Sequence, residues 1–478
     1  MGVSPKVLKQ AIPLPGDLAF ILSSSHKLRH AYVVGGAVRD ALLGTQPKDF
    51  DIEVYGLSES ALLRELKKHG QANLVGRSFG VIKLKTQAGK EYDFSLPRTE
   101  RKTAKGHGGF DVRTDPNMDR EQASARRDFT VNALFYDSRE EHVMDYHGGL
   151  TDLNQQRLHP TSDAFIEDPL RVLRAMQFLS RFSFQSSEAL VQRARSIVPT
   201  FSELSTERVR AEWLKWASQS RSPSRGLHFL RDSSWIQHFP ELLPLSETPQ
   251  DSIWHPEGNV FEHTCYVCDA LASLDEWRSA TEINRRILMF AALGHDLGKA
   301  TTTQEVLRAG RRRIISPGHE KQSGTRLATF LDRMNTSKRI REPALSLVTN
   351  HMFRADPLTD RAIRRLASRV APANIRQLTM LMTADAWGRP PLPREIPDHV
   401  SELKQRSEQQ NLSDKQAPPL LQGRDLIQQG LSPGPAFGRL LTEAYEAQLE
   451  GLFHCRKTAQ QWLANRLSEN EGTRPSKS

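Results

Sequence analysis

Hydrophobic and polar positions follow two different patterns along this chain, and the change comes near residue 165. Upstream of it, apolar runs of four to six residues alternate with longer amphipathic stretches, as in strands and helices that share one sheet. The runs predict strands at 31–34, 50–55, 81–86 and 91–96, and helices at 37–43 and 58–69. A small α/β sheet with helices on one side is therefore expected.

Downstream of residue 165 the spacing becomes helical. In the segment DPLRVLRAMQFLSRF, Leu170, Leu173 and Met176 recur on one helix face. A Pro-rich stretch, GRPPLPREIP, is typical of a linker. The segments expected along the chain are a helical lead-in at 1–30, an α/β domain at 31–138, a helical region at 139–250, a second helical domain at 255–388, a linker at 389–420, a helical C-terminal segment at 421–468 and a disordered tail at 469–478.

Composition narrows the class of protein. The 478 residues exceed what one compact core usually holds. The net charge of +10 favours a polyanionic partner without identifying it. Three cysteines are too few for a disulfide framework, so a reducing, cytoplasmic setting is expected, with Cys265 and Cys268 as buried thiols. No apolar run approaches the ~20 residues that span a bilayer, so a membrane is not an expected partner. The oligomeric state is not indicated.

Two carboxylates share one face of the predicted strand at 50–55. Asp49 and Asp51 project together, while Phe50 between them points to the opposite face. Two adjacent like charges favour a divalent cation between them, and Mg²⁺ prefers such oxygen ligands. A third carboxylate, Asp93 on a neighbouring strand, would complete a two-metal clamp for phosphoryl displacement. The plainer alternative is acidic decoration of an exposed edge strand.

A glycine turn precedes these carboxylates. Gly35 and Gly36 follow the first strand and precede a helix, so the backbone there can approach a phosphate closely. Arg39 adds a charge-assisted donor on that helix. A phosphate cradle beside a strand that binds metal is the arrangement that nucleotidyl transfer needs.

These residues carry a family resemblance. GGAVRDALLG followed by KDFDIEVYG resembles the head-domain signature of class II tRNA nucleotidyltransferases and bacterial poly(A) polymerases, in the polymerase-beta-like superfamily. Three later segments match the family in order: RRDFTVNALFYD at 126–137, DYHGGLTDL at 145–153 and EDPLRVLRAMQF at 167–178. The second is similar to a hinge-like element between head and neck. The resemblance implies an α+β head followed by an all-α neck and body.

The resemblance also implies roles for single residues. Asp49 and Asp51 would bind two Mg²⁺ ions, and Gly36 with Arg39 would hold the triphosphate. The remaining nucleotide contacts would come from the later motifs, at Arg127, Asp128, Asn132, Asp168, Arg171 and Arg174. One departure is Gln177, where many members carry a further arginine.

Asp168 and Arg171 have a physical interpretation beside the resemblance. A carboxylate accepts from an exocyclic amine, and a guanidinium donates to a ring nitrogen or carbonyl oxygen. The pair therefore suits cytosine and adenine, whereas uracil and guanine would leave Asp168 unpaired. The alternative is a structural ion pair within one helix, since residues three apart are neighbours.

The activity implied is addition of CCA to tRNA 3′ ends from CTP and ATP without a nucleic-acid template. Residues 98–126 form a long polar segment that resembles the family's flexible specificity loop, which favours full CCA addition. A poly(A) polymerase or an enzyme that adds only A is the first alternative. A second is a phosphohydrolase whose head binds tRNA passively.

A second constellation of metal-binding side chains lies further along the chain. Its histidines and aspartates are His263, His295, Asp296, His319, His351 and Asp385. Their order over residues 255–388 resembles the HD phosphohydrolase superfamily. The resemblance implies an all-α domain and four primary ligands, with His319 and His351 as extra ligands of binuclear members. Imidazole and carboxylate suit a transition metal, Mg²⁺ or Mn²⁺. The alternative is a degenerate domain kept for tRNA contact.

Overall fold

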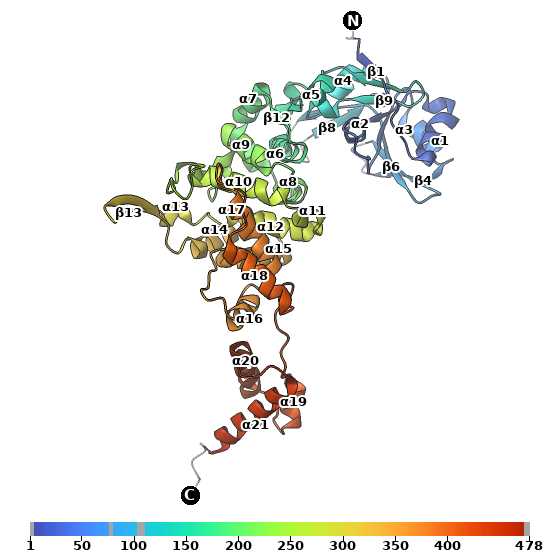
Figure 1. Cartoon of the computed structure of the whole chain (residues 1–478). Helices are drawn as coiled ribbons and strands as arrows, with labels where there is room; N and C mark the ends of the chain where they lie inside the picture. Colours follow the sequence, from blue (N-terminus) through green and yellow to red (C-terminus); the bar gives the residue numbers. More distant parts are fainter. Residues whose placement is uncertain (1–3, 76–79, 103–109, 473–478) are drawn as a thin grey trace. The chain divides into compact units, whose positions relative to one another are not determined.

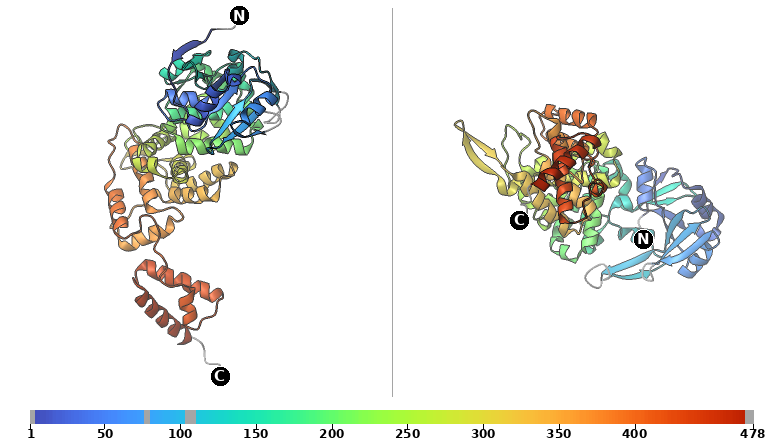
Figure 2. Two further views of the ribbon diagram at one scale, coloured as in Figure 1. Left: turned by 90° about the vertical axis from the view of Figure 1, so that its right-hand side faces the viewer. Right: turned by 90° about the horizontal axis from the view of Figure 1, so that it is seen from below.

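The computed structural model describes residues 4–75, 80–102 and 110–472. The chain forms two compact units, residues 1–243 and 244–478, which Figures 1 and 2 colour from blue to green and from yellow to red. In the part of the chain that the structure describes, no helix is both long and apolar enough to cross a membrane.

An eight-stranded mixed sheet forms the start of the first unit (Figure 1). Its strands in chain order are β1 (Lys6–Lys9), β2 (Ala31–Val34), β3 (Asp51–Val54), β4 (Gly70–Val75), β5 (Val81–Thr86), β6 (Glu91–Ser95), β9 (Phe135–Asp137) and β10 (His142–Asp145). Their order across the sheet is β1-β10-β9-β2-β3-β6-β5-β4. Strands β3 and β6 pair in parallel, and all other neighbours pair antiparallel.

Three helices accompany the sheet: α1 (Gly16–Ser24), α2 (Gly36–Leu42) and α3 (Glu59–Leu66). Helix α1 is bonded to strands β5 and β6 through Asp17. The Asp17 carboxylate accepts hydrogen bonds from Thr86 and Tyr92 at 2.9 and 2.7 Å. In β3, Ile52 and Val54 are fully buried. The mixed α/β head expected from the sequence is confirmed.

The sheet is larger than the sequence pattern predicts. The four predicted strands and two predicted helices are present, with ends shifted by at most three residues. The expectation of an entirely helical lead-in is wrong at Lys6–Lys9, which forms edge strand β1. All four side chains of β1 are exposed, so no apolar face marks it, and pairing with β10 makes it a strand. Strands β9 and β10 extend the sheet to Asp145, past the expected boundary at 138.

The long polar segment at 98–126 contains regular secondary structure among its described residues. It contains the antiparallel hairpin of β7 (Arg98–Lys102) and β8 (Phe110–Thr114), then helix α4 (Arg120–Ala125). The described residues of this segment therefore form a hairpin and a helix, where the sequence predicted one long loop. The loop's centre, 103–109, lies outside the described residues.

The remainder of the first unit is helical. After the 3-10 turn η2 (Thr130–Asn132) come α5 (Gly149–Asn154), α6 (Leu170–Phe182), α7 (Glu188–Ser196), α8 (Thr206–Gln219) and α9 (Pro223–Asp232). Helix α6 packs between α8 and α9. Gly226 of α9 permits this approach, because a Cβ there would lie 2.5 Å from the carbonyl oxygen of Met176. Trp213, Trp216 and Trp235 fill the core.

The second unit is mostly helical, as expected, with one β hairpin. Its elements are α10 (Val260–Ser273), α11 (Asp275–Ser279), α12 (Glu282–Gly294), α13 (Lys299–Thr302), β13 (Gln304–Arg308), β14 (Arg311–Ile315), α14 (His319–Arg333), α15 (Lys338–Asn350), α16 (Asp360–Arg369), α17 (Ile375–Trp387), α18 (Asp398–Gln409), α19 (Gly423–Gln428), α20 (Pro435–Glu450) and α21 (Arg456–Gly472). Helices α10, α12 and α17 pack on one another, and α14 and α15 pack against α12.

Two expectations at the end of the chain need correction. The expected linker at 389–420 contains helix α18, which packs against α17. Val400 and Leu403 of α18 are buried. The expected disordered tail begins too early, because α21 continues to Gly472. Residues 421–463 contribute a small core of their own, which includes Leu426, Leu440 and Phe453.

The expected hinge-like element at 145–153 is closely packed. The Asp145 carboxylate accepts three backbone hydrogen bonds, from His147, Gly149 and Leu150, each at 3.0 Å. It thereby satisfies N–H groups at the start of α5. A Cβ on Gly149 would lie 2.3 Å from the carbonyl oxygen of Thr130 in η2. The 145–153 segment is therefore in close backbone contact with the 126–137 segment.

Gly149→Ala is expected to destabilise the protein by about 1–3 kcal/mol, because overpacking forces the backbone of η2 or α5 to shift. The free energy of unfolding, measured by urea titration followed by circular dichroism, checks it. Gly16→Ala is the matched control, since Gly16 also begins a helix and a Cβ there meets nothing within 4 Å. Equal stability of the two variants would contradict the packing described for Gly149.

Candidate active sites

The glycine turn, an arginine and a carboxylate meet at the end of β2. Gly35 has a positive φ of 74°, a conformation that side chains disfavour. A Cβ there would lie 2.9 Å from Arg127 Nη1 and 3.9 Å from Asp51 Oδ2. Gly35 is therefore required by both its backbone and its surroundings. The Nη1 end of the Arg127 guanidinium is therefore the donor nearest the turn.

The three predicted carboxylates lie at one edge of this turn. In the parallel pair β3–β6, Asp51 stands opposite Asp93, and Asp49 precedes Asp51 by two residues. Phe50 and Ile52 are buried on the other face. Removal from water raises the pKa of Asp51, and the charges of Asp93, Asp49 and Glu53 add to the rise while Arg127 opposes it. A bound cation would relieve this crowding.

Glu53 is a site residue that the sequence reasoning missed. Its side chain is fully buried, and it lies 3.3 Å from Arg126 Nη2 and 3.5 Å from Arg127 Nη2. It also accepts a hydrogen bond from Tyr55 at 2.5 Å, and burial followed by the Glu53 charge raises the pKa of that tyrosine. The signal was present, since Glu53 continues the alternation of Asp49 and Asp51. Its role is to hold Arg127 beside the turn.

Arg39 lies against Gly36, but its guanidinium is buried and occupied. It donates to Asp40 through Nε at 2.8 Å and to Asn132 through Nη1 at 2.5 Å. Its charged end also lies over the rings of Phe178 and Phe182, at 5.0 and 4.6 Å from their centroids. The structure therefore shows Arg39 joining α2 to α6. Its predicted contact with a triphosphate stays a prediction.

The chain of buried polar groups continues from Asn132. The Asn132 amide donates to Asp128 Oδ1 at 2.9 Å, and Arg174 binds Asp128 Oδ2 through Nε and Nη2 at 2.7 and 2.6 Å. Burial alone would raise the pKa of Asp128, but Arg174 and Asn132 lower it below its usual range. Asn132, Asp128 and Arg174 thus hold one another, and the 126–137 segment is locked to α6.

Asp168 and Arg171 do not form the helical ion pair considered as an alternative. Asp168 lies just before α6, where it accepts from the backbone of Leu170 and pairs with Arg208 of α8 at 2.8 Å. Arg171 donates to the carbonyl oxygens of Ala164 and Arg126 at 2.7 and 2.5 Å. Arg208 was not predicted, because its position on α8 has no motif spacing to α6.

Gln177 faces the interior of the first unit. It is 2% exposed, and its side-chain nitrogen has no hydrogen-bond partner. An arginine at this position, as in many relatives, would bring a charge into the same surroundings. The structure therefore supports no nucleotide contact by Gln177.

The second site is a cluster in which one carboxylate joins two groups of histidines. Asp296 Oδ2 lies 3.3 Å from His295 Nε2 and 3.5 Å from His263 Nε2. Its Oδ1 lies 3.2 Å from His319 Nε2. These four residues are buried. They come from α10, from the residues that follow α12, and from the start of α14.

The two remaining predicted residues complete the cluster. Asp385 of α17 lies 3.2 Å from His263 Nε2, and His351 lies 3.3 Å from His319, Nε2 to Nε2. All six predicted residues are therefore brought together. Potential ligand atoms of His263, His295 and Asp296, and separately of Asp296, His319 and His351, lie within 4.8 Å of one another.

The rings are oriented for metal binding. Each Nδ1 faces a backbone carbonyl oxygen: His263 that of Gly388 at 3.2 Å, His295 that of Ala292 at 2.7 Å, His319 that of Ser316 at 2.8 Å and His351 that of Val348 at 2.6 Å. Because each Nδ1 donates its proton outward, the Nε2 atoms face the centre. The Nε2 atoms of His263 and His295 are only 3.3 Å apart, an arrangement that a shared cation stabilises. The donor set fits a divalent metal.

Three residues around the cluster were not predicted. Lys299 binds Asp296 Oδ2 at 2.7 Å. Glu257 accepts from His263 Nδ1 at 2.7 Å and from His255 Nδ1 at 2.8 Å. Burial alone would raise the pKa of Glu257, but these two hydrogen bonds lower it to about 2. Their signal was their place beside the predicted ligands, in WHPEGNVFEHT and HDLGKA.

The surroundings shift the pKa values of His263 and His351 in opposite directions. Burial alone would lower the pKa of His263, but hydrogen bonds to Asp385 and Glu257 raise it to about 9. Burial and the neighbouring His295 lower the pKa of His351 to about 4. His351 is therefore neutral and ready to act as a ligand at neutral pH, whereas metal binding at His263 must displace a proton.

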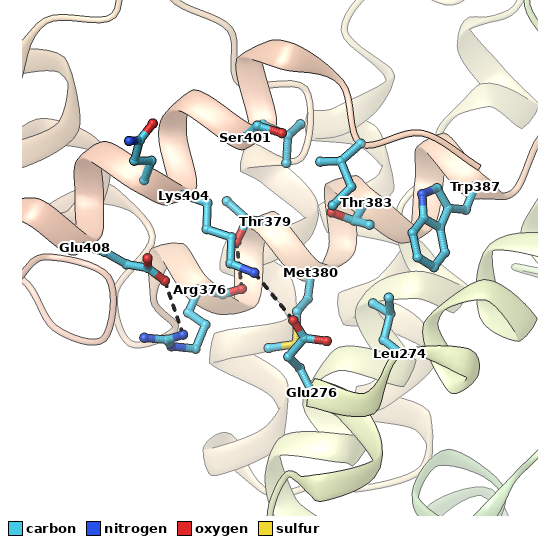
Figure 3. A pocket seen from close by; sticks show the side chains of 13 residues that line it. Leu274, Glu276, Arg376, Thr379, Met380, Thr383, Trp387, Ser401, Lys404 and Glu408 are labelled. Atoms are coloured by element: carbon cyan, nitrogen blue, oxygen red, sulfur yellow. Dashed lines mark hydrogen bonds and ion pairs between the residues drawn. The ribbon is translucent and has the colours of Figure 1, made fainter. Parts of the chain in front are cut away.

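A cavity of about 300 Å³ in the second unit is separate from this cluster. Figure 3 shows Thr379, Thr383 and Trp387 of α17 lining it, with Lys404 reaching toward Glu276 across the opening. The Lys404–Glu276 and Arg376–Glu408 pairs, at 3.4 and 3.5 Å, close its polar rim. None of the six cluster residues lines it, so it does not serve as the entrance to the metal cluster.

Comparison with known proteins agrees with both sites. Residues 31–159 match the poly A polymerase head domain, and residues 260–378 match the HD domain. The multifunctional CCA protein of Xanthomonas campestris pv. campestris (strain B100) is 34% identical over 425 residues, or 86% of this chain and 96% of that protein. That of Xylella fastidiosa (strain 9a5c) is 35% identical over 376 residues, or 75% and 84%.

A solved structure shares the fold. The Bacillus stearothermophilus CCA-adding enzyme in complex with CTP matches with a TM-score of 0.63 at 20% identity, over 96% of this chain and 100% of that one. Fold and motifs together define a nucleotidyltransferase head joined to an HD domain. The chain belongs to the family of multifunctional CCA proteins. The expected relationship to the class II tRNA nucleotidyltransferases is confirmed.

Glu53→Gln is expected to reduce the nucleotidyl-transfer rate about tenfold or more, because Arg126 and Arg127 lose their buried counter-charge. Arg127 then leaves its place beside Gly35, and the KM for the nucleotide rises more than the KM for the RNA. Initial rates at varied nucleotide concentration measure this. Glu91→Gln, an exposed carboxylate on β6, is the control. A folded Glu53 variant with unchanged nucleotide KM would separate Glu53 from the site.

Proposed function

We propose that this chain adds CCA to tRNA 3′ ends from CTP and ATP, with Asp49, Asp51 and Asp93 as the ligands of Mg²⁺. The observation that carries this is the placement of Asp51 opposite Asp93 and within reach of Arg127 and the Gly35 turn. Mg²⁺ bound there would neutralise triphosphate charge and activate the attacking 3′-hydroxyl. The all-oxygen ligand set favours Mg²⁺ over softer metals.

The protein's own groups bind and orient the nucleotide. Gly35 and Gly36 leave the backbone open to a phosphate, and Nη1 of Arg127 lies beside the same turn. Arg39 and Asn132 act as positioning residues in this proposal, because their side chains bind one another inside the protein. Asp128 and Arg174 extend that support to α6.

Base choice is assigned to the start of α6. The Asp168 carboxylate accepts from the amino group that cytosine and adenine share, and Arg171 donates to their ring edge. Arg208 holds Asp168 in place, and two carbonyl oxygens hold Arg171. Asp168 and Arg171 are half-buried and already held in place. A base without the amino group would leave the Asp168 carboxylate without a hydrogen bond, which costs binding free energy.

The HD cluster is proposed to hydrolyse phosphate esters, including 2′,3′-cyclic phosphates. Asp296 supplies an oxygen to each of two ligand groups, so the cluster has room for two ions of Mg²⁺, Mn²⁺ or a transition metal. Such ions activate water and bind phosphoryl oxygens. Lys299 would orient Asp296, and Glu257 would orient His263. A cytoplasmic location suits both activities and the free thiols of Cys265, Cys268 and Cys455.

Asp51→Asn is expected to reduce incorporation at least about a hundredfold, since loss of a metal ligand costs several kcal/mol of transition-state stabilisation. The assay supplies tRNA lacking its CCA end with CTP, ATP, UTP and GTP singly and in pairs. The parent is expected to use CTP and ATP only. Incorporation of ATP but never CTP would instead favour an A-adding enzyme or a poly(A) polymerase. An Asp51 variant with near-normal rates would remove Asp51 from the site.

His295→Ala combined with Asp296→Ala is expected to abolish hydrolysis of 2′,3′-cyclic nucleotides and to leave CCA addition nearly unchanged. The reason is that the two sites use separate ligand sets. Bound metal, measured by elemental analysis, should fall in parallel, and a thermal melt checks that the variant is folded. Hydrolysis at the parent's rate would refute the cluster as an active site. Loss of CCA addition in a folded variant would show that the HD domain serves the transferase instead.

A further inference from the structure

Hairpin β13–β14 belongs to the second unit. In the chain it lies between two residues of the histidine–aspartate cluster. Asp296 and α13 precede it, and His319 at the start of α14 follows it. Figures 1 and 2 show the hairpin standing clear of the helices around it. A shorter loop could connect α13 and α14. The hairpin is therefore not needed for packing of the helical core, and a function in binding is worth considering.

The base of the hairpin is fixed to the wall of the metal cluster. Thr303 and Ser316 bind one another through their hydroxyls at 2.8 Å, and the Ser316 carbonyl accepts from His319 Nδ1. Arg313 forms a two-point pair with Asp251, at 2.5 and 3.1 Å. The hairpin is therefore held in a defined place beside the cluster.

The tip of the hairpin presents two arginines side by side. Arg308 and Arg311 are cross-strand partners, joined by a two-residue turn in which Ala309 and Gly310 have positive φ values. Both arginines are exposed, and neither has an ion-pair partner among the described residues. Like charges directly opposite each other destabilise a strand pair. The arrangement is favourable when an anion lies between them.

Arg312 provides a contrast on the same hairpin. It stands opposite Leu307, so its side chain lies on the other face from Arg308 and Arg311. It pairs with Glu305 at 3.2 Å. The unpaired positive charge is therefore confined to one face of the tip.

We propose that this hairpin is an RNA-binding arm, in which Arg308 and Arg311 hold backbone phosphates of a strand whose 3′-terminal phosphoester is hydrolysed in the HD cluster. The proposal rests on the phosphohydrolase function proposed for that cluster. RNA is the occupant that fits, because it carries a repeating anionic backbone and a 3′ end that reaches the cluster while upstream phosphates reach the tip. Guanidinium groups bind such phosphates through paired donors.

The length of the arm sets a size requirement. Five residues per strand extend about 17 Å at ~3.3 Å per residue. At about 3.4 Å of axial rise per nucleotide in a stacked strand, this equals about five nucleotides. A mononucleotide in the cluster therefore has no contact with Arg308 or Arg311. Substrates of five or more nucleotides gain that contact.

The test uses the full-length chain and RNA strands of one to eight nucleotides that end in a 2′,3′-cyclic phosphate. For the parent, KM for hydrolysis should fall with length and level off near five nucleotides. Arg308→Gln and Arg311→Gln should each raise KM for the longest strand about tenfold and leave the mononucleotide rate unchanged. Each should also reduce the salt dependence of log KM by about 0.7, the share of one phosphate contact. Arg312→Gln, with the same change of charge on the other face, should resemble the parent.

The outcomes separate the arm from the cluster. The proposed RNA-binding role of the hairpin is wrong if the parent hydrolyses strands of all lengths with one KM, or if all three variants lose affinity equally. The proposed phosphohydrolase activity is not contradicted by either result. If the parent hydrolyses neither mononucleotide nor longer strands with metal bound, the proposed hydrolysis is wrong and the arm's delivery role falls with it. A thermal melt excludes misfolding of the variants as the cause of a lost length effect.

Discussion

The buried chain of polar groups from Arg39 to Arg174 is the interaction on which the first unit depends. Arg39 is buried and Arg174 is half-buried, and they pair with Asp40 and Asp128. A buried charge without a partner costs several kcal/mol, so each group in the chain is stable only while the others remain. The same bonds connect α2, which follows the glycine turn, to α6, which begins at Asp168. The residues proposed to bind phosphate and those proposed to recognise the base are thereby held at one fixed separation.

The two metal-binding regions solve different electrostatic problems. In the head, carboxylates crowd around Asp51, and the charge of Arg127 lowers its pKa against their effect. Asp51 is exposed, so a metal bound there would have access from the solvent together with a nucleotide. In the HD cluster, buried imidazoles and Asp296 face one another, with outer hydrogen bonds that fix each ring. Such a site is formed before a substrate arrives, and a metal bound there would be held by the protein's own side chains.

Much of this could be predicted from the sequence, for identifiable reasons. Asp49 and Asp51 follow the strand period, and the HD residues occur in motifs, so both sets could be found by spacing. Glu53 was overlooked, although it obeys the same period, because no motif demanded a buried acid. Arg208 acts through a tertiary contact that the sequence does not display. Lys299 was also overlooked, although it lies only three residues after Asp296. Strand β1 has no buried face, so only its pairing with β10 reveals it.

The parallel pairing of β3 with β6 has an evolutionary consequence. These two strands are neighbours in the sheet but not in the chain, since α3, β4 and β5 lie between them. Loops among the intervening elements tolerate insertions, because closing a longer loop costs little free energy. A single residue inserted within β6 ahead of Asp93 would instead turn that carboxylate to the buried face. Related chains should therefore vary freely in length between these strands while the phase of β6 relative to β3 is preserved.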